Sequence, residues 1–192
     1  MATVEQAIEV EVPVTTAYNQ WTQFEMFPQF MEGVVDVRQL DDTHLHWVAE
    51  VGGERREWDA EIVRQEPDRA IEWRSLDGRQ PSGEVLFEPV NGGDRTRVTV
   101  HMEYEAQGMK ESLGSTLGLD DRRVKQDLER FKELIESRGI ETGAWRGEVR
   151  GGEVRQGTMS PTAGMGTDPM RPAGGAGSER PDELGERPTN PY

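Results

Sequence analysis

The feature that most constrains the fold is a long stretch of strand-like segments between Gly33 and Ala106. Short runs there alternate apolar and polar residues, which is the period of a strand with one buried and one solvated face. The last run alternates most clearly, with an apolar or aromatic residue at every second position from Val98 to Tyr104. The runs are separated by segments with turn chemistry, DDTH, GGE, EPDR, DGRQPSG and NGGD. We therefore predict an antiparallel meander with one apolar face.

That apolar face needs a cover, and residues 121–138 provide an amphipathic helix. Its apolar residues fall at i, i+4, i+7 and i+11, and they are Val124, Leu128, Phe131 and Ile135. Asp120 can cap the start of this helix, and Gly139 can end it. The preceding segment, MKESLGSTLGL, also has a helical pattern. We expect a long C-terminal helix over about residues 110–138.

Before the meander, the sequence predicts one strand and two short helices. Residues 3–12 alternate until Pro13, as expected for a strand. The segment VTTAYNQWTQ then has helical spacing, and FEMFPQFM gives a second short helix that Pro28 interrupts. The predicted fold is α+β, with about six to seven strands curved around one long helix.

Composition excludes several classes of function. The chain has 37 acidic and only 22 basic residues, so its field repels phosphate backbones and we expect no nucleic-acid partner. It has no cysteine, which excludes disulfides, a thiolate nucleophile and sulfur-ligated metals. No apolar stretch approaches the roughly 18 residues of a spanning helix, and no signal peptide pattern is present. We expect a cytoplasmic protein without a transmembrane segment.

The composition changes near the C-terminus. Residues 151–192 contain nine glycines and six prolines and almost no aliphatic residue. Such a segment buries too little apolar surface to offset the entropy lost on ordering. We predict a folded domain over residues 1–147 and a disordered tail over residues 148–192.

Several stretches resemble a known superfamily. They are WTQFEMFPQFMEGVVDVRQLDD, HLHWVAEVGGERREWDAEIVRQEPDRAIEWRS, GEVLFEPV, TRVTVHMEYE and DLERFKELIESRG followed by AWRG. Together with the element order, they resemble the START-like or SRPBCC superfamily, in its polyketide cyclase/dehydrase branch, which is similar to coenzyme Q-binding proteins. The resemblance covers about residues 3–147 and implies a helix-grip fold with a cavity between sheet and long helix. We expect AWRG to pack the end of the domain; the alternative is that it caps an opening.

Strand alternation and the resemblance together predict the cavity lining. The apolar candidates are Trp47, Trp58, Ile71, Trp73, Phe87, Val100, Met102, Leu128 and Phe131. The polar candidates that could orient a ligand are Arg56, Ser75 and Tyr104. Arg56 can instead lie in water at a strand end, because it stands in the run ERRE. The candidates for the cavity mouth are Phe27, Phe30, Met31 and Leu117, although the phenylalanines can also dock the second short helix.

We predict neither a metal nor a cofactor. His44, His46 and His101 alternate opposite to Trp47 and Met102, so they should face solvent. No nucleophile elbow, zinc-protease motif, phosphate loop or dinucleotide motif is present.

Three functions remain open. The first is noncatalytic binding of a quinone-, lipid- or polyketide-like molecule, as a carrier or sequestering module. The second is an aromatase/cyclase or dehydratase, although no inward histidine or carboxylate is apparent to catalyse it. The third is a mostly filled, stress-related interaction domain whose protein partners the sequence does not identify.

Overall fold

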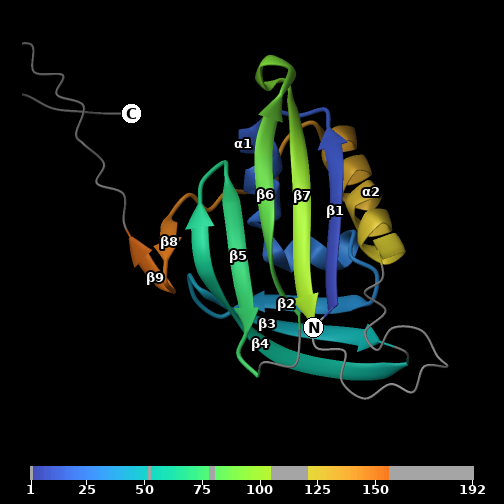
Figure 1. Ribbon diagram of the computed structural model, residues 1–192, viewed down its shortest axis with the longest axis vertical. Coiled ribbons are helices and arrows are strands. Elements are labelled where there is room, and N and C mark those ends of the chain that lie inside the picture. The colour runs from blue at the N-terminus through green and yellow to red at the C-terminus, as the bar shows by residue number, and fades with distance from the viewer. Residues whose placement is uncertain (1, 52, 78–80, 105–120, 156–192) are drawn as a thin grey trace, which may run out of the picture. The chain divides into compact units, whose positions relative to one another are not determined.

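The computed structural model describes residues 2–51, 53–77, 81–104 and 121–155 (Figure 1). Its elements, in chain order, are β1 (Ala2–Val10), α1 (Val14–Trp21), the 3-10 helix η1 (Phe24–Gln29), β2 (Val34–Gln39), β3 (His44–Val51), β4 (Glu54–Glu66), β5 (Ala70–Ser75), β6 (Ser82–Val90), the 3-10 helix η2 (Asn91–Gly93), β7 (Arg95–Tyr104), α2 (Asp121–Arg138), β8 (Glu148–Arg150) and β9 (Glu153–Arg155). This order confirms the predicted α+β helix-grip fold. Within the described residues, no helix combines the length and apolar character needed to cross a membrane.

The strands form an antiparallel sheet in the order β1-β7-β6-β5-β4-β3-β2. Strand β4 joins two parts of it, since its first half pairs with β3 and its second half with β5. The register with β5 shifts between Ile62 and Arg64, and such a bulge bends a strand. Figure 1 shows the result: β2 and β3 cross the lower end of the upright strands β5, β6, β7 and β1. The sheet thus curves around its inner face, where the helices lie.

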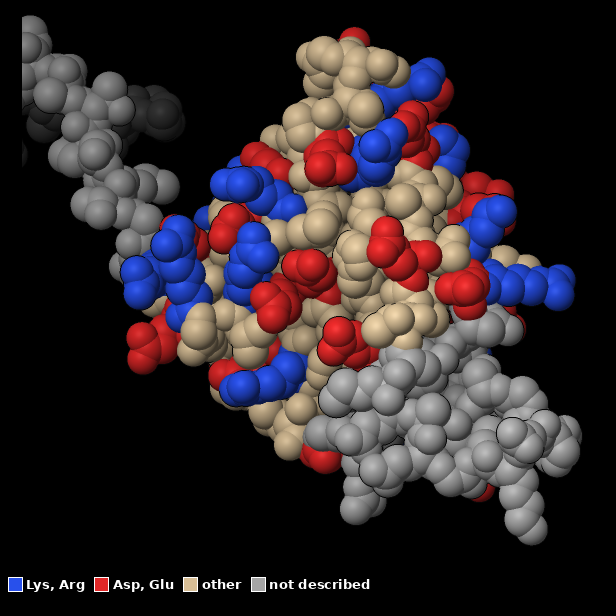
Figure 2. Space-filling view, viewed as in Figure 1, with Lys and Arg blue, Asp and Glu red and all other residues tan. Residues whose placement is uncertain are grey.

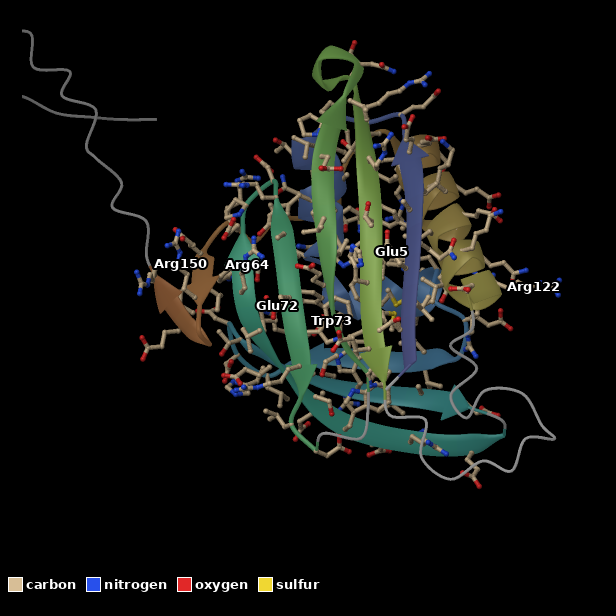
Figure 3. The ribbon with its side chains drawn as sticks, in the orientation of Figure 1. Glu5, Arg64, Glu72, Trp73, Arg122 and Arg150 are labelled. Atoms are coloured by element: carbon tan, nitrogen blue, oxygen red, sulfur yellow. The ribbon has the colours of Figure 1, made fainter. Side chains whose placement is uncertain are left out.

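The outer face of the sheet is charged and solvated. Arg64 lies across from Glu72 on one side and from Arg150 on the other (Figure 3). Glu5 lies across from His101 in the pairing of β1 with β7. Figure 2 shows acidic and basic side chains interspersed over this surface. The single apolar face predicted from alternation is therefore the inner one.

Helix α2 covers part of the inner face with its predicted apolar stripe. Its buried residues are Val124, Leu128, Phe131 and Ile135. The helix ends at Gly139 as predicted, where φ is 69° and the amide donates a 2.8 Å hydrogen bond to the Ile135 carbonyl. Residues 110–120, where the prediction began the helix, lie outside the described residues.

The domain extends beyond the predicted boundary at residue 147. Strand β8 pairs with β4 at Gln65 and Arg64, beyond the point where β3 ends its pairing, and Val149 is fully buried. Strand β9 then pairs with β8. The prediction missed this hairpin because its strands have three residues each and are joined by Gly151 and Gly152. Residues 156–192 lie outside the described residues, so the disordered tail stays a prediction.

The AWRG segment packs the end of the domain, as the sequence favoured. The Trp145 amide donates to Thr22 Oγ1 at 3.1 Å, and the Arg146 guanidinium pairs with both oxygens of Asp68 at 2.9 and 2.7 Å. Neither side chain belongs to the cavity lining described below.

Candidate functional site

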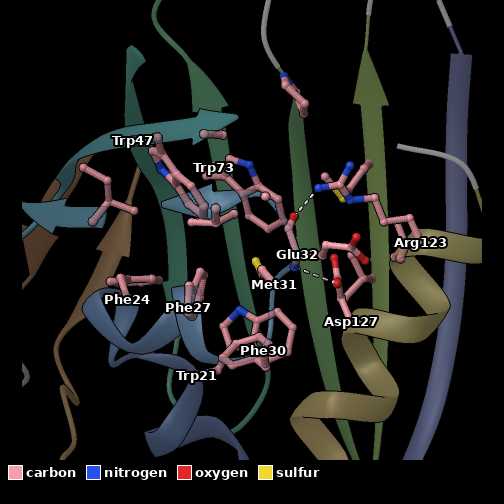
Figure 4. Close-up of a pocket in the computed structure, with 18 of the residues that line it drawn as sticks. Trp21, Phe24, Phe27, Phe30, Met31, Glu32, Trp47, Trp73, Arg123 and Asp127 are labelled. Atoms are coloured by element: carbon pink, nitrogen blue, oxygen red, sulfur yellow. Dashed lines mark hydrogen bonds between the residues drawn. The ribbon is translucent and has the colours of Figure 1, made fainter. Parts of the chain in front are cut away.

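A cavity of about 120 Å³ lies between the inner face of the sheet, η1 and α2 (Figure 4). Its lining consists of Trp21, Phe24, Phe27, Phe30, Met31, Glu32, Gly33, Val34, Leu45, Trp47, Ala49, Trp58, Ile62, Ile71, Trp73, Pro81, Val100, Met102, Arg123, Val124, Asp127 and Leu128. For scale, an engineered apolar cavity of about 150 Å³ stays dry and binds benzene. The space therefore suits one small ring, or the end of a larger molecule.

Three tryptophans from neighbouring strands form one wall. Trp47 and Trp58 pair across β3 and β4, and their rings stack with centroids 5.9 Å apart and planes 7° apart. Trp73 lies across from Ile62 on β4 and from Gly83 on β6. A Cβ at Gly83 would lie 2.2 Å from the His101 carbonyl oxygen and 3.1 Å from the Trp73 ring, so only glycine allows this packing.

The opposite wall comes from the helices that precede β2. Phe27 and Phe30 are buried and pack around Trp21, with ring centroids 5.6 and 5.8 Å from the Trp21 ring. Half-buried Met31 continues this wall. The structure therefore brings Phe27, Phe30 and Met31 together in the cavity lining, and their position at its mouth stays a prediction. Leu117 lies outside the described residues.

Among the described residues, the charged side chains of the lining are those of Glu32, Arg123 and Asp127. Asp127 accepts a 3.0 Å hydrogen bond from the Glu32 amide and another from Arg130. Arg123 donates to the Glu32 carbonyl, and both contacts with Glu32 are drawn in Figure 4. Burial raises the pKa of the Asp127 carboxyl above its usual value, although these hydrogen bonds and the nearby arginines oppose the shift.

One polar atom in the wall is buried without a partner in the described part of the chain. The Trp47 indole Nε1 is buried, and no acceptor among the described residues lies within hydrogen-bonding distance of it. It is the single buried side-chain nitrogen or oxygen in the described part of the chain for which this holds. Buried polar groups are nearly always hydrogen-bonded, so this atom requires an explanation.

Most of the apolar residues predicted from alternation meet in this lining. They are Trp47, Trp58, Ile71, Trp73, Val100, Met102 and Leu128. Phe87 and Phe131 lie outside it, because they pack against Trp21 with ring centroids 6.1 and 4.9 Å away. They form a filled part of the same core. A ligand-binding role for any of these residues stays a prediction.

The structure places two of the three polar candidates away from the cavity. Arg56 lies across from Ala49 in the register, but its guanidinium pairs with Glu54 at 3.4 Å near the start of the strand. Ser75 is buried, and its hydroxyl donates to Asp77 at 2.5 Å. Tyr104 ends β7, and its side chain lies outside the described part of the structure.

The charged residues that line the cavity were not among the residues predicted from the sequence. Arg123 and Asp127 each precede an apolar position of the α2 stripe, Val124 and Leu128, and so lie at the edge of that stripe. Their position next to the apolar stripe was the one feature of the sequence that could have identified them. It was not sufficient, because α2 contains many charged residues and only the orientation of the helix shows which of them reach the cavity.

The histidines lie on the other side of the sheet from the tryptophans, next to acidic residues. His46 Nδ1 is 2.7 Å from Asp59, His44 Nδ1 is 3.0 Å from Asp41, and His101 Nδ1 is 3.4 Å from a Glu5 oxygen. Across the described residues, no group of three or more histidine or acidic side chains has a geometry that could hold a metal ion.

Comparisons with known proteins agree with this architecture. The model of the family described as polyketide cyclase / dehydrase and lipid transport matches residues 10–133. An uncharacterized 17.2 kDa protein of Streptomyces lincolnensis, encoded between melC2 and rnhH, is 49% identical over 150 residues, which is 78% of this chain and 99% of that protein.

Solved structures show the same fold. A Deinococcus radiodurans protein superimposes with a TM-score of 0.58 and 30% identity, over 71% of this chain and 98% of its own. A START superfamily protein from Mycobacterium smegmatis superimposes with a TM-score of 0.54 and 16% identity, over 71% of this chain and 95% of its own.

Proposed function

The chain belongs to the polyketide cyclase/dehydrase and lipid transport family, and we propose that it binds a hydrophobic small molecule in the cavity, as a carrier or sequestering module. The observation that supports this proposal is the composition of the cavity lining. Among the described residues, its side chains are apolar or aromatic except for those of Glu32, Arg123 and Asp127. Burying apolar ligand surface there gains about 25 cal/mol per Å². A quinone-, lipid- or polyketide-like molecule has the required apolar surface.

Native mass spectrometry of the full chain, purified from its own host, tests this proposal directly. A stoichiometric apolar passenger, identified after denaturing extraction, is the expected result. A binding titration with the neutral fluorescent probe N-phenyl-1-naphthylamine gives a second measurement that does not depend on the natural ligand.

A matched pair of variants locates the bound probe. Ala49→Leu adds volume inside the cavity, whereas Ala7→Leu adds the same atoms at an exposed position of β1. We expect Ala49→Leu to weaken probe binding about tenfold or more, because the added side chain occupies space that the probe needs. Ala7→Leu should leave binding unchanged. Melting curves check that both variants fold. Equal binding by wild type and Ala49→Leu would place the probe elsewhere and overturn the proposal.

The second candidate is a cyclase or dehydratase, which Asp127 favours. Its carboxyl borders the cavity, where a carboxylic acid can donate a proton to a substrate oxygen, and burial raises its pKa above the usual value. With the N-acetylcysteamine thioester of a β-hydroxy acid as substrate, loss of the Cα proton and the β-hydroxyl as water would produce the absorbance of an α,β-unsaturated thioester. Wild-type turnover that Asp127→Asn abolishes without loss of probe binding would support this candidate. Absence of turnover by the wild type would favour the carrier.

A further inference from the structure

We propose that the C-terminal hairpin joins two copies of this chain, by antiparallel pairing of the outer edge of β9 with the same edge of a second copy. The hairpin contains the sequence GEVR twice, at residues 147–150 and 152–155, with Gly151 between them. The first repeat contains β8 and the second contains β9. Among the described residues, the cavity lining includes neither repeat, so the pairing is independent of ligand binding.

The pairing of β8 with β9 shows that this sequence is complementary to itself. The antiparallel register pairs Glu148 with Arg155, Val149 with Val154 and Arg150 with Glu153. Opposite charges directly across from each other stabilise a pair of strands, whereas like charges destabilise it. Antiparallel pairing of GEVR with GEVR therefore places each charge across from its opposite, with the valines in the centre.

The two repeats have different surroundings, although their sequences are identical. Strand β8 lies between β4 and β9, and its Val149 is fully buried. Strand β9 pairs with β8 alone among the described strands, and Figure 1 shows it on the outer side of β8. Its Val154 is 40% exposed. In the described part of the structure, the outer edge of β9 is thus open to another strand.

The turn of the hairpin determines which backbone groups of β9 point outward. Gly151 and Gly152 form the turn, and their φ angles of 62° and 79° are those that a type I′ hairpin requires. The residues that flank such a turn, Arg150 and Glu153, form a hydrogen-bonded pair, and bonded and non-bonded pairs alternate along the strands. The amide and carbonyl of Val154 therefore point away from β8.

A second copy fits this edge around a twofold axis that passes beside Val154. The two valines exchange both backbone hydrogen bonds, and Glu153 of each copy lies across from Arg155 of the other. This arrangement repeats between copies the register that β8 and β9 adopt within one chain. A parallel arrangement would instead set like charges side by side. The edge has three residues, so the dimer is weak, with a dissociation constant of about 100 µM or more.

Sedimentation equilibrium of the full chain, between about 10 µM and 1 mM, tests this pairing. Val154→Pro removes the outward amide and no hydrogen bond of the hairpin, whereas the control Val154→Thr keeps that amide. We expect wild type and Val154→Thr to dimerise with dissociation constants within about threefold of each other. Val154→Pro should weaken dimerisation about tenfold or more. Melting curves check that both variants fold. A dimer that persists in Val154→Pro uses another surface and overturns the inference, as does a wild type that stays monomeric.

Hydrogen exchange of the Val154 amide, followed by NMR, identifies what covers the edge. Exchange at Val154 should slow as the wild-type concentration rises. The amide of Val35, an exposed residue on the edge strand β2 at the other end of the sheet, is the control and should not respond to concentration. Slow exchange at Val154 in a monomer at every concentration would mean that the same chain covers this edge. Fast exchange at every concentration would mean that no second copy pairs there. Either result overturns the inference.

Discussion

The hydrophobic core has a filled region and a hollow region, which differ in how closely their aromatic side chains pack. In the filled region, around Tyr18, Phe87 and Phe131, aromatic rings pack edge to face and the side chains are almost completely buried. In the hollow region, Trp47 and Trp58 come from the inner face of the same sheet, but they border an open cavity. Aromatic residues on an apolar face are thus compatible with either outcome.

The two regions also differ in how they treat buried polar atoms. The Tyr18 hydroxyl accepts a 3.0 Å hydrogen bond from Gln65 Nε2, and the Arg146 guanidinium lies 5.7 Å from the centre of the Tyr18 ring. Trp47 Nε1 has no such partner among the described residues. The filled region thus pairs the buried hydroxyl of Tyr18, whereas the indole N–H of Trp47 is buried without an acceptor among the described residues.

Truncation of an aromatic side chain should affect stability far more in the filled region. Phe131→Ala removes a fully buried ring, and we expect it to lower the free energy of unfolding by about 3–5 kcal/mol. Trp58 is half-buried and borders the cavity. We therefore expect Trp58→Ala to lower the free energy of unfolding by less than about half of the loss in Phe131→Ala. Urea denaturation measures both. Equal losses would mean that the hollow region is packed as tightly as the filled one.

Tyr18 in the filled region should make the free energy of unfolding decrease at alkaline pH. Burial raises the pKa of Tyr18 from 10.0 to about 12, more than the Gln65 hydrogen bond and the Arg146 charge lower it. The folded state therefore keeps this proton while the unfolded state loses it, so stability is fully present below pH 10 and falls as pH rises toward 12. The shift corresponds to a loss of about 2–3 kcal/mol.

Tyrosinate absorbance at alkaline pH tests this effect. The chain has three tyrosines, and one of them should ionise later than the others. Tyr18→Phe should remove the late phase and reduce the loss of stability between pH 10 and 12. A titration in which all three ionise together in the folded protein would contradict the burial of Tyr18.

The sequence was sufficient to predict the sheet and its inner face. Alternation identified Trp47, Trp58 and Trp73 correctly as inward residues, because β3, β4 and β5 pair without a shift up to Ile62. After the bulge at Ile62, the inward residue is Gln65, and a strict alternation does not predict it. A bulge depends on the partner strand, which a local pattern does not contain.

The division into filled and hollow regions could not be predicted from the sequence. Phe87 follows the same alternation as Trp73, but Trp21 and Tyr18 from α1 pack against Phe87. That contact depends on where a helix docks. For the same reason, the reach of Asp127 into the cavity follows from the orientation of α2 and not from the charge pattern.

Removing a buried polar group should destabilise the filled region more than the hollow region, with smaller effects than the truncation of an aromatic ring. Gln65→Leu leaves the buried Tyr18 hydroxyl without its donor, and we expect the free energy of unfolding to fall by about 1–2 kcal/mol. Trp47→Phe removes a donor that has no acceptor among the described residues, so it should lower stability by less. Thermal denaturation of both variants without ligand compares them. A larger loss for Trp47→Phe would show that its N–H is already satisfied.

The smallest effect should come from the ion pair at the edge of the filled region. Arg146 contacts both Asp68 oxygens and the Asn19 side chain, but it is partly exposed. Lysine cannot reproduce the two parallel hydrogen bonds, so Arg146→Lys should lower stability by about 0.5–1 kcal/mol, and less at high salt. Because Arg146 lies outside the cavity lining, the affinity for N-phenyl-1-naphthylamine should stay unchanged. A loss of affinity in this variant would show that the filled region controls the shape of the hollow one, and the two could then no longer be treated as independent.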